Sequence, residues 1–468
     1  MVSFSDLDVA IILIFFGLVL LTGFISGYKQ KDTSEDYLLS GRKVGLFLFV
    51  LTNVATWYGG ILGVGEFTYR YGLISWFTQG FPYYVFAIIF ALFFAKKIRN
   101  ASLFTIPDKL EQTYGKTVGL ISSLLIFILV SPAPYLLMIG SLLSLIFDIP
   151  LIWSLIIGVL LSAAYLFKGG YRSDVYTDAL GFFVMFIGFI IIVAVALLRF
   201  GGIEFLESNL PAAHLNLTGD VSPTFIIVWF LIALWTFTDP GFHQRCYAAE
   251  SGKIAVKGIL ISIIFWALFD FLTTATGLFA RASIMDLENP VLAFPMLAEK
   301  ILGPGLKGIF YAALFATILS TLNSFLFISA TTFGRDFIYK MSRKRDEQII
   351  NRNTRIGLLA ASALAITMAY TVNSVIELWY LIGSIVIPSI IILVITSYYQ
   401  RFKISNKGAV IEILAALTAS ISWLIIRPSY VEMPVIGEIE PMIIGLFAAL
   451  VIHLIFWSRE RFSLEHNG

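Results

Sequence analysis

Apolar residues gather in thirteen long runs along the chain, separated by short linkers that hold most of the charged residues. About 20 consecutive apolar residues are enough to cross a bilayer as a helix. The pattern therefore predicts an all-α polytopic membrane protein with about 13 transmembrane helices in one transmembrane domain, residues 1–468. The runs are 8–28, 44–71, 75–98, 117–147, 150–168, 175–199, 222–247, 254–281, 306–335, 354–372, 376–399, 408–427 and 440–457.

The composition agrees with this pattern, because 58% of the residues are hydrophobic and only 13% are charged. The linkers also predict which way the chain runs. Of the 32 basic residues, 26 fall in alternate linkers on the side that includes the C-terminus, and 6 fall on the other side. Cytoplasmic loops are enriched in Lys and Arg. We therefore expect a multi-pass protein of the cell membrane, with its N-terminus outside and its C-terminus in the cytoplasm.

Two of the predicted helices are interrupted. The second run contains Trp57-Tyr58-Gly59-Gly60, and the seventh contains Thr238-Asp239-Pro240-Gly241. Glycine and proline weaken a helix. The two runs are five segments apart and so cross in opposite directions, which is typical of a secondary transporter built from inverted repeats. The alternative is that the glycines only allow close helix packing. We expect repeats at 44–199 and 222–399, with peripheral helices at 8–28 and 408–457.

The ninth run carries a column of polar side chains in an otherwise apolar helix. Five lie within eight residues, and each would be costly in a membrane unless it were used. One reading is that the hydroxyls bond to carbonyls of their own helix or to a neighbouring helix. The other is a site for a small hard cation such as Na⁺, which prefers oxygen ligands. The residues are Thr317, Ser320, Thr321, Asn323 and Ser324.

Other polar residues suggest a solute site near the two interruptions. Asp178 lies just inside the sixth run and is either functional, as a second cation ligand or part of the inner gate, or a salt-bridge partner of a nearby basic residue such as Arg172. Asp239 either binds solute or caps the half-helix that Pro240 starts, and His243 lies beside it. Candidate solute-binding residues are Trp57, Gly60, Gln79, Tyr135, Asp239 and His243.

Several functional classes are disfavoured. The chain has one cysteine and four scattered histidines, so no multi-cysteine metal site or disulfide framework is expected. It has no Walker loop and no nucleotide-binding fingerprint, which argues against an ATP-driven pump, and no set of catalytic groups converges. We expect neither an enzyme nor a nucleic-acid partner.

Three motifs together resemble the sodium/solute symporters, a family that includes sodium/glucose, sodium/proline and sodium/sialic acid transporters. The resemblance covers nearly the whole chain. Its motifs are Gly169-Gly170 with Thr177-Asp178-Ala179-Leu180, then Asp239 with Gln244-Arg245, Ala248-Ala249 and Lys253, and finally Ser320-Thr321-Leu322-Asn323-Ser324 with Arg335-Asp336. The resemblance implies the LeuT-type fold of five plus five inverted helices, here with one extra N-terminal and two extra C-terminal helices.

The resemblance also implies where sodium binds. The sodium ligands would be the carbonyls of Asn53, Thr56 and Thr317 with the hydroxyls of Ser320 and Thr321. Some members hold a second sodium, which here would use Asp178, Ser320, Asn323 and Ser324. Gln79 falls where some members place a polar substrate ligand. The chain departs from the family pattern at Trp57-Tyr58-Gly59-Gly60 and at Asp239-Pro240-Gly241, so the resemblance does not name the solute.

These observations predict a sodium-coupled symporter that imports a small polar organic solute by alternating access. Two alternatives remain at this level. One is a sensor or receptor that binds solute without transport and contacts a partner through the basic linker 335–355. The other is a proton-coupled transporter of the same fold that uses Asp178 or Asp239.

Overall fold

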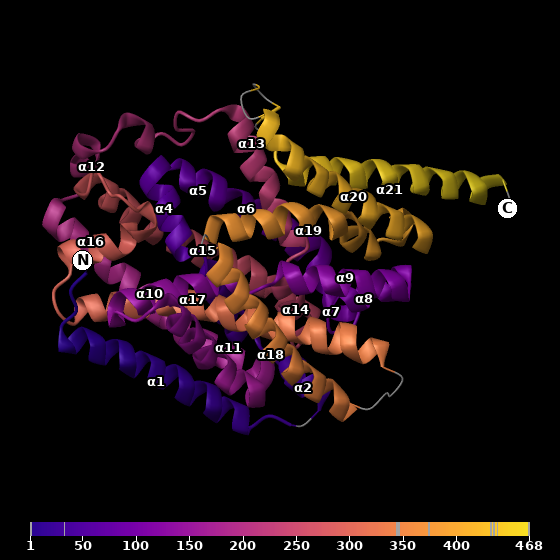
Figure 1. Cartoon of the computed structure of the whole chain (residues 1–468), viewed down its shortest axis with the longest axis horizontal. Coiled ribbons are helices and arrows are strands. Elements are labelled where there is room, and N and C mark those ends of the chain that lie inside the picture. Colours follow the sequence, from indigo (N-terminus) through magenta and orange to yellow (C-terminus); the bar gives the residue numbers. More distant parts are fainter. Residues whose placement is uncertain are drawn as a thin grey trace.

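The chain is a bundle of α-helices (Figure 1). The computed structural model describes residues 2–466 except Asp32, 343–346, 373–374, 431–432, 434–435 and Glu438. Within these residues the extended pairing is a single bridge between Val44 and Ala249. The α-helices are α1 (Asp6–Tyr28), α2 (Ser34–Leu39), α3 (Leu46–Ala55), α4 (Ile61–Tyr71), α5 (Ile74–Gln79), α6 (Phe81–Phe90), α7 (Lys96–Asn100), α8 (Ile106–Tyr114), α9 (Lys116–Leu129), α10 (Ala133–Phe147), α11 (Leu151–Phe200), α12 (Ile203–Asn209), α13 (Pro223–Ile232), α14 (Pro240–Ala248), α15 (Gly252–Ser283), α16 (Ala293–Ile301), α17 (Leu306–Thr331), α18 (Glu347–Val372), α19 (Val375–Ser397), α20 (Asn406–Ile426) and α21 (Pro441–His466).

The prediction of a polytopic membrane protein is confirmed. In the described part of the chain, 10 helical runs are long and apolar enough to cross a membrane, and the bent pair α3–α4 makes 11. The fifth and sixth predicted segments both lie in α11, and the eleventh predicted segment corresponds to α19. Each of the thirteen predicted segments therefore has a helical counterpart.

Helix α11 contains a sharp bend where the sequence predicted a linker. Its 50 residues would extend for about 75 Å if straight, more than twice the thickness of the hydrocarbon layer. Gly170 breaks the helix with φ 52° and ψ −144°. A Cβ there would lie 2.3 Å from the carbonyl oxygen of Tyr37, so both the backbone angle and the space require glycine. The fifth and sixth segments thus meet at one residue.

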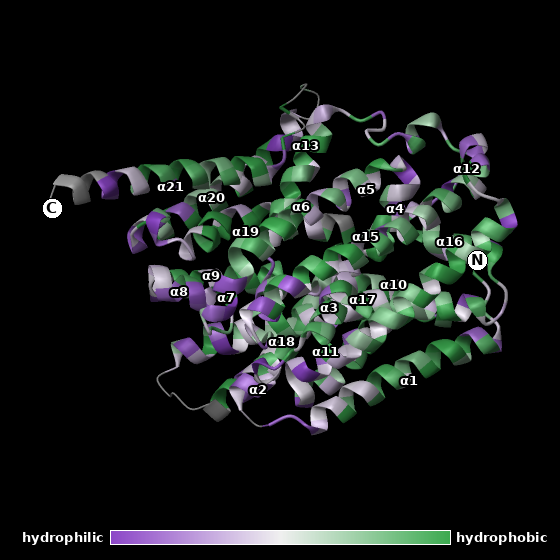
Figure 2. Cartoon of the chain, turned by 180° about the vertical axis from the view of Figure 1, so that it is seen from behind, coloured by the Kyte–Doolittle hydropathy of each residue, from purple (hydrophilic) through white to green (hydrophobic). Residues whose placement is uncertain are grey.

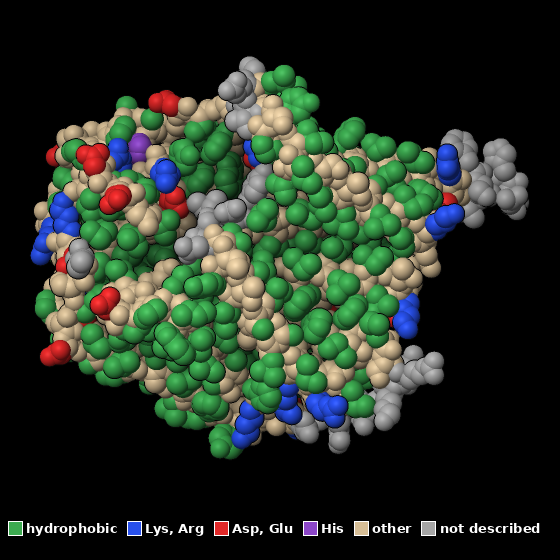
Figure 3. Space-filling model, viewed as in Figure 1, with side chains coloured by type: hydrophobic (Ala, Val, Ile, Leu, Met, Phe, Trp, Pro, Cys, Tyr) green, Lys and Arg blue, Asp and Glu red, His purple; other side chains and the backbone are tan. Residues whose placement is uncertain are grey.

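Helix α17 lies inside the bundle, and every residue of its apolar window is buried. It packs against α11, α18 and α1, whereas α20 and α21 pack together at the upper right of Figure 1. Outer helices such as α1 and α21 are mostly hydrophobic along their length, with hydrophilic residues near helix ends (Figure 2). In Figure 3, hydrophobic side chains cover the middle of the face and charged side chains collect toward its left, right and lower edges. The two termini lie at opposite ends of the molecule (Figure 1).

Both predicted helix interruptions are confirmed. The second segment runs as α3, the short 3₁₀ turn η2 (Thr56–Tyr58) and α4, and it bends by 56°. The seventh runs as α13, the 3₁₀ turn η5 (Ala233–Phe237) and α14. Between η5 and α14, Asp239 takes an extended backbone conformation and caps the new helix. These interruptions place irregular backbone inside the protein, where side chains can satisfy it.

Candidate functional site

The interruption of the second segment faces the middle of α17. The hydroxyl of Thr321 donates a 2.6 Å hydrogen bond to the carbonyl oxygen of Thr56 in η2. Gly59 lets the two elements approach, because a Cβ at this position would lie 2.2 Å from the Thr321 hydroxyl oxygen. Two groups proposed from the sequence as sodium ligands therefore lie side by side.

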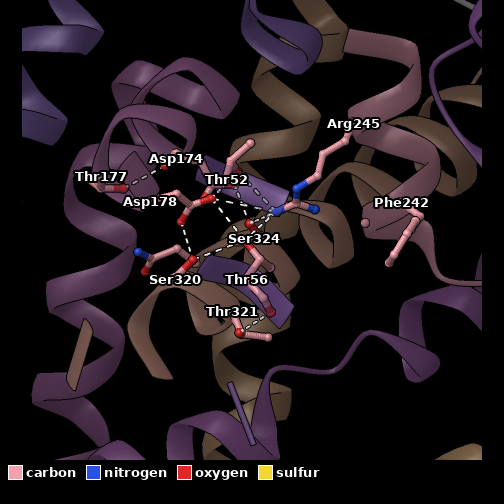
Figure 4. A network of polar contacts seen from close by, with 12 residues as sticks. Thr52, Thr56, Asp174, Thr177, Asp178, Phe242, Arg245, Ser320, Thr321 and Ser324 are labelled. Carbon is pink, nitrogen blue, oxygen red and sulfur yellow. Dashed lines mark hydrogen bonds and ion pairs between the residues drawn. The ribbon is translucent and has the colours of Figure 1, made fainter. Parts of the chain in front are cut away.

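Asp178 lies beside this contact and is fully buried. It projects from α11 toward both α17 and the α3–η2 region (Figure 4). Its Oδ1 accepts a 2.6 Å bond from Ser320, while Oδ2 accepts from Thr56 at 3.1 Å and from Thr52. The hydroxyls of Thr56 and Ser320 are themselves 3.1 Å apart. Three helices thus supply oxygens to one small volume.

Arg245 reaches the same cluster from α14 (Figure 4). Its Nη2 lies 3.7 Å from Asp178 Oδ2 and donates to the hydroxyls of Thr56, Thr52 and Ser324. The side chain is only 3% exposed. A buried carboxylate needs a partner of opposite charge, and here the basic residue comes from the seventh segment rather than from the nearby linker.

Asp174 extends the cluster by one helical turn. It is fully buried, four residues before Asp178, and its Oδ2 accepts a 2.7 Å bond from Ser324. The pairs Asp174–Ser324 and Asp178–Ser320 match because residues four apart lie on one helix face. Since the numbers rise on α11 as they fall on α17, these two helices run antiparallel here.

The other polar residues predicted in the sodium site make different contacts. Thr317 bonds through its hydroxyl to carbonyls of its own helix, at Ala313 and Leu314, which leaves its own carbonyl as the group to consider. Asn323 donates to the hydroxyl of Tyr165. The buried Nδ2 of Asn53 has no hydrogen-bond partner among the described residues.

The second interruption is satisfied largely by its own segment. Asp239 Oδ1 accepts from the backbone N–H groups of Gly241 at 2.6 Å and Phe242 at 3.1 Å. Its Oδ2 accepts from Trp235 Nε1 at 2.9 Å. The Nε2 atom of His243 lies 3.0 Å from the carbonyl oxygen of Phe237. Of the two roles considered for Asp239, these bonds are those of a helix cap.

Aromatic side chains fill the space between the two interruptions. The ring of Trp57 lies 4.9 Å from Trp266, 5.0 Å from Tyr83 and 5.5 Å from Phe242, between centroids. Phe242, rather than its neighbour His243, therefore faces Trp57.

The remaining solute-site candidates lie around this aromatic group. A Cβ on Gly60 would lie 2.5 Å from the Trp379 ring, so Gly60 lets α19 approach the break. Tyr135 packs against Phe325 with centroids 5.1 Å apart and against Trp379 at 6.2 Å. Gln79 is the last residue of α5 and is half-buried.

Some residues of these clusters were not among the predicted site residues: Thr52, Asp174 and Arg245 in the polar cluster, and Tyr83, Phe242 and Trp266 around Trp57. Two of them carry a visible signal. Thr52 lies four residues before Thr56, and Asp174 lies four residues before Asp178, so each extends a candidate along the same helix face. Arg245 belongs to a family motif, but nothing in the sequence indicates that it reaches the sixth segment.

An ion-pair network lies beyond the polar cluster, where α17 continues into the π-helical turn η7 (Thr332–Tyr339). Asp108 of α8 pairs with Arg335 at 2.8 Å and Lys340 at 2.6 Å, and Lys340 also pairs with Glu111 at 2.6 Å. Burial would raise the pKa of the Asp108 carboxyl, but the charges of Arg335 and Lys340 outweigh burial and hold that pKa well below its usual range. The network ties α8 to η7.

Comparison with known proteins agrees with this architecture. The high-affinity choline transporter 1 of Torpedo marmorata is 27% identical over 410 residues, covering 80% of this chain and 69% of that protein. The sodium/proline symporter 2 of Staphylococcus saprophyticus is 26% identical over 480 residues, covering 96% of this chain and 92% of that protein.

Solved structures show the fold. A Na⁺-coupled sialic acid symporter, in a substrate-bound outward-open state, superposes with a TM-score of 0.84 at 17% identity, covering 97% of this chain and 98% of that one. A nucleobase-cation-symport-1 family transporter superposes with a TM-score of 0.53 at 14% identity, covering 89% and 92%. The fold is thus the LeuT-type transporter fold, as the resemblance implied.

The model of the sodium:solute symporter family matches residues 37–416, which include both interruptions, the polar cluster and the ion-pair network. The chain is a multi-pass membrane protein and belongs to the sodium:solute symporter family.

Proposed function

We propose that this protein is a sodium-coupled symporter that imports a small polar organic solute by alternating access. The observation that carries the proposal is the contact between the Thr321 hydroxyl and the Thr56 carbonyl at the helix break. A sodium ion between these groups would link η2 to α17, because hard cations bind oxygen ligands such as backbone carbonyls. The proposed ligands are the carbonyls of Asn53, Thr56 and Thr317 and the hydroxyls of Ser320 and Thr321.

Sodium binding at this position gives a physical route to coupling. The site joins elements of the two proposed repeats, 44–199 and 222–399, so the ion favours arrangements in which η2 and α17 are close. A ligand shifts a conformational equilibrium only by binding one state better than the other. We propose that the N-terminus lies outside and the C-terminus in the cytoplasm. A membrane potential that is negative inside favours sodium entry by about 2.3 kcal/mol per charge per 100 mV.

The solute site is proposed to lie between the two interruptions, where aromatic rings surround Trp57. Rings of Trp, Tyr and Phe attract organic cations through their faces. The relatives' names mention choline, a quaternary ammonium compound, and proline, whose nitrogen is charged at neutral pH. We propose a solute that carries such a nitrogen. The proposed lining is Trp57, Gly60, Gln79 and Tyr135, with Asp239 and His243 shaping its floor.

Uptake into proteoliposomes tests this function. Radiolabelled choline and proline serve as probes, each with an inward sodium gradient and with an equal potassium gradient. We expect accumulation of one probe that needs sodium and rises when the interior is made negative. Uptake that follows a proton gradient and ignores sodium would replace the sodium proposal with proton coupling.

A matched variant tests the proposed solute site separately from the sodium site. Trp57→Leu removes the central aromatic face and keeps an apolar side chain, so it should abolish accumulation and leave the stabilisation of the protein by sodium in place. The same substitution at the exposed Trp153 is the control. Saturable binding of a probe without accumulation, in the wild type, would instead identify a sensor.

A further inference from the structure

Helix α15 carries a carboxylate, Asp270, inside the run Gly252–Ser283 that is long and apolar enough to cross the membrane. The side chain is half-buried. Ionisable residues at such a depth are rare and are normally paired with a group of opposite charge. Within the described part of the chain, the titratable groups that interact with this carboxylate are Tyr84 and Tyr58, and neither is basic. The negative charge of Asp270 is therefore not balanced by these residues.

Other acids in the interior of the bundle differ from Asp270 in this respect. Asp178 is paired with Arg245, and Glu412 is paired with His453. Asp239 caps α14 and has both oxygens bonded within its own segment. A basic partner or a helix cap thus accounts for each of these three acids, and neither accounts for the carboxylate of α15.

Asp270 borders the aromatic group around Trp57. Trp266 lies four residues earlier on α15, about 6 Å along the helix axis, and its ring is 4.9 Å from that of Trp57. Tyr84, which bonds to Asp270, directly follows Tyr83 on α6, whose ring is 5.0 Å from that of Trp57. The acid and its hydrogen-bond partner therefore stand on two helices that also supply rings to this group.

The carboxylate is held in a defined position. The Tyr84 hydroxyl donates to Asp270 Oδ2 and accepts a 3.3 Å bond from Trp76 Nε1. A Cβ on Gly80 would lie 2.7 Å from the same Oδ2, so glycine leaves the space into which the carboxylate projects. A fixed negative charge beside aromatic ring faces is a suitable surrounding for an organic cation.

We propose that Asp270 is the counter-charge for the positively charged nitrogen of the solute. The proposal rests on the proposed function above and adds a specificity-determining residue to its solute site. In the proposed orientation α15 runs outward from Trp266 to Asp270, so an entering cation meets Asp270 before it reaches Trp57. An uncharged solute leaves the carboxylate unbalanced in the membrane interior, and this penalty selects against it.

Matched charged and uncharged probes test the proposal on the purified full-length protein in sodium. Tryptophan fluorescence is titrated with choline and with its dimethylbutanol analogue, in which carbon replaces the charged nitrogen. Proline and cyclopentanecarboxylate form the second pair. The wild type is compared with Asp270→Asn, which keeps the shape and an acceptor for Tyr84 and removes the charge. Glu412→Gln, in the peripheral helices α20 and α21, is the control for removing an acid elsewhere in the bundle.

We expect the wild type and Glu412→Gln to bind the charged member of one pair more tightly than the uncharged member. Asp270→Asn should weaken binding of that charged probe by at least about tenfold and leave binding of the uncharged probe unchanged. Asp270→Glu, which keeps the charge, should retain the preference. An unchanged preference in Asp270→Asn would overturn the proposal.

A purely structural role of Asp270 predicts a different pattern. Both members of a pair would then bind more weakly together, and Tyr84→Phe, which removes the hydrogen bond but keeps the charge, would reproduce the loss. If Asp270→Asn does not give a monodisperse protein, Asp270→Ser replaces it, because a small hydroxyl also removes the charge.

Failure of this proposal is distinguishable from failure of the sodium-coupled function. A wild type that binds neither charged probe, or binds both members of each pair equally, contradicts the role of Asp270, whereas stabilisation of the protein by sodium would still support the sodium site. Conversely, a wild type without sodium-driven accumulation in proteoliposomes contradicts the symporter, and the binding preference still decides the role of Asp270.

Discussion

The two interrupted segments are built alike, each as a helix, a 3₁₀ turn and a second helix, but their polar groups find hydrogen-bond partners in different ways. In the seventh segment, Asp239 accepts three hydrogen bonds from its own segment, and His243 bonds to a carbonyl of the same segment. In the second segment, the Thr56 carbonyl receives its bond from Thr321, which is 265 residues away in the sequence. The hydrogen bonds of the seventh segment survive movement of the neighbouring helices, whereas the Thr56–Thr321 bond of the second segment does not.

This difference indicates which interruption can respond to an ion. A break whose polar groups are already paired within its own segment has none left over to bind an ion. A break whose carbonyl accepts a hydrogen bond from another helix has that carbonyl free to bind an ion whenever the other helix moves. Arg245 adds a link between the two, because it stands on the half-helix after the second break and donates to Thr56 at the first.

The largest expected effect comes from removing this link. Arg245→Met leaves the buried Asp178 and Asp174 without their basic partner, and breaking a buried ion pair in this way costs about 3–5 kcal/mol. We expect a much lower melting temperature in detergent than for the wild type. Arg70→Met is the control, because its side chain is 50% exposed and its partner Glu66 lies one helical turn away. Equal melting temperatures for the wild type and Arg245→Met would show that the guanidinium does not stabilise the polar cluster.

A smaller effect is expected at the contact between the first break and α17. Thr321→Val keeps the shape of the side chain and removes the hydroxyl, so the apparent affinity for sodium should fall at least about tenfold, equal to about 1.4 kcal/mol. The measurement is the rise in melting temperature with sodium concentration, at constant ionic strength with potassium.

The matched control for this substitution is Thr331→Val on the same helix. The Thr331 hydroxyl bonds to the Phe327 carbonyl four residues earlier and lies outside the cluster. Its sodium response should equal that of the wild type. An unchanged response in Thr321→Val would contradict a sodium site at the first break.

The second break should affect stability and leave the sodium response alone. Asp239→Ala removes a helix cap, for which a loss of about 1 kcal/mol is typical. Asp239→Ser keeps a capping oxygen and should recover part of that loss. Both are compared by melting temperature with and without sodium. A weakened sodium response in these variants would mean that the two breaks are not separable.

The smallest effect is expected at Asp108, whose contribution to stability should not change with pH near neutrality. The Asp108 pKa is lowered in the folded protein, so its ion pairs with η7 add stability above the unfolded value of about 3.9 and lose it only as the pH falls further. Between about pH 5 and pH 8, the difference in melting temperature between the wild type and Asp108→Asn should therefore stay constant. A difference that shrinks across this interval would contradict a lowered pKa.

Much of the fold could be predicted because its signals are local. The lengths of the apolar runs predicted the crossings, and Pro240 with the neighbouring Gly241 predicted the second interruption. The bend of α11 was predicted only as a linker, since a single glycine with positive φ replaces a loop and no sequence pattern specifies that backbone angle.

The candidate site was predictable only in part, because its contacts join distant segments. Ser320 and Thr321 stood out as hydroxyls in an apolar helix. Arg245 did not, since basic residues at the end of a membrane segment usually face the cytoplasm. Asp174 was read as part of a linker, and its burial depends on the bend at Gly170, which carries the following turn into the bundle.

The complete burial of the apolar window of α17 has a consequence for how the protein is made. A helix that contacts no lipid in the finished bundle gains little from being apolar there, which is why this one can carry so many hydroxyls. During synthesis, however, it must enter the membrane before α18 and α19 exist to cover it. The segments already made, above all α1 and α11, then provide the first shelter for its polar face. Deleting α1 should therefore reduce the yield of inserted α17 more than that of any outer helix.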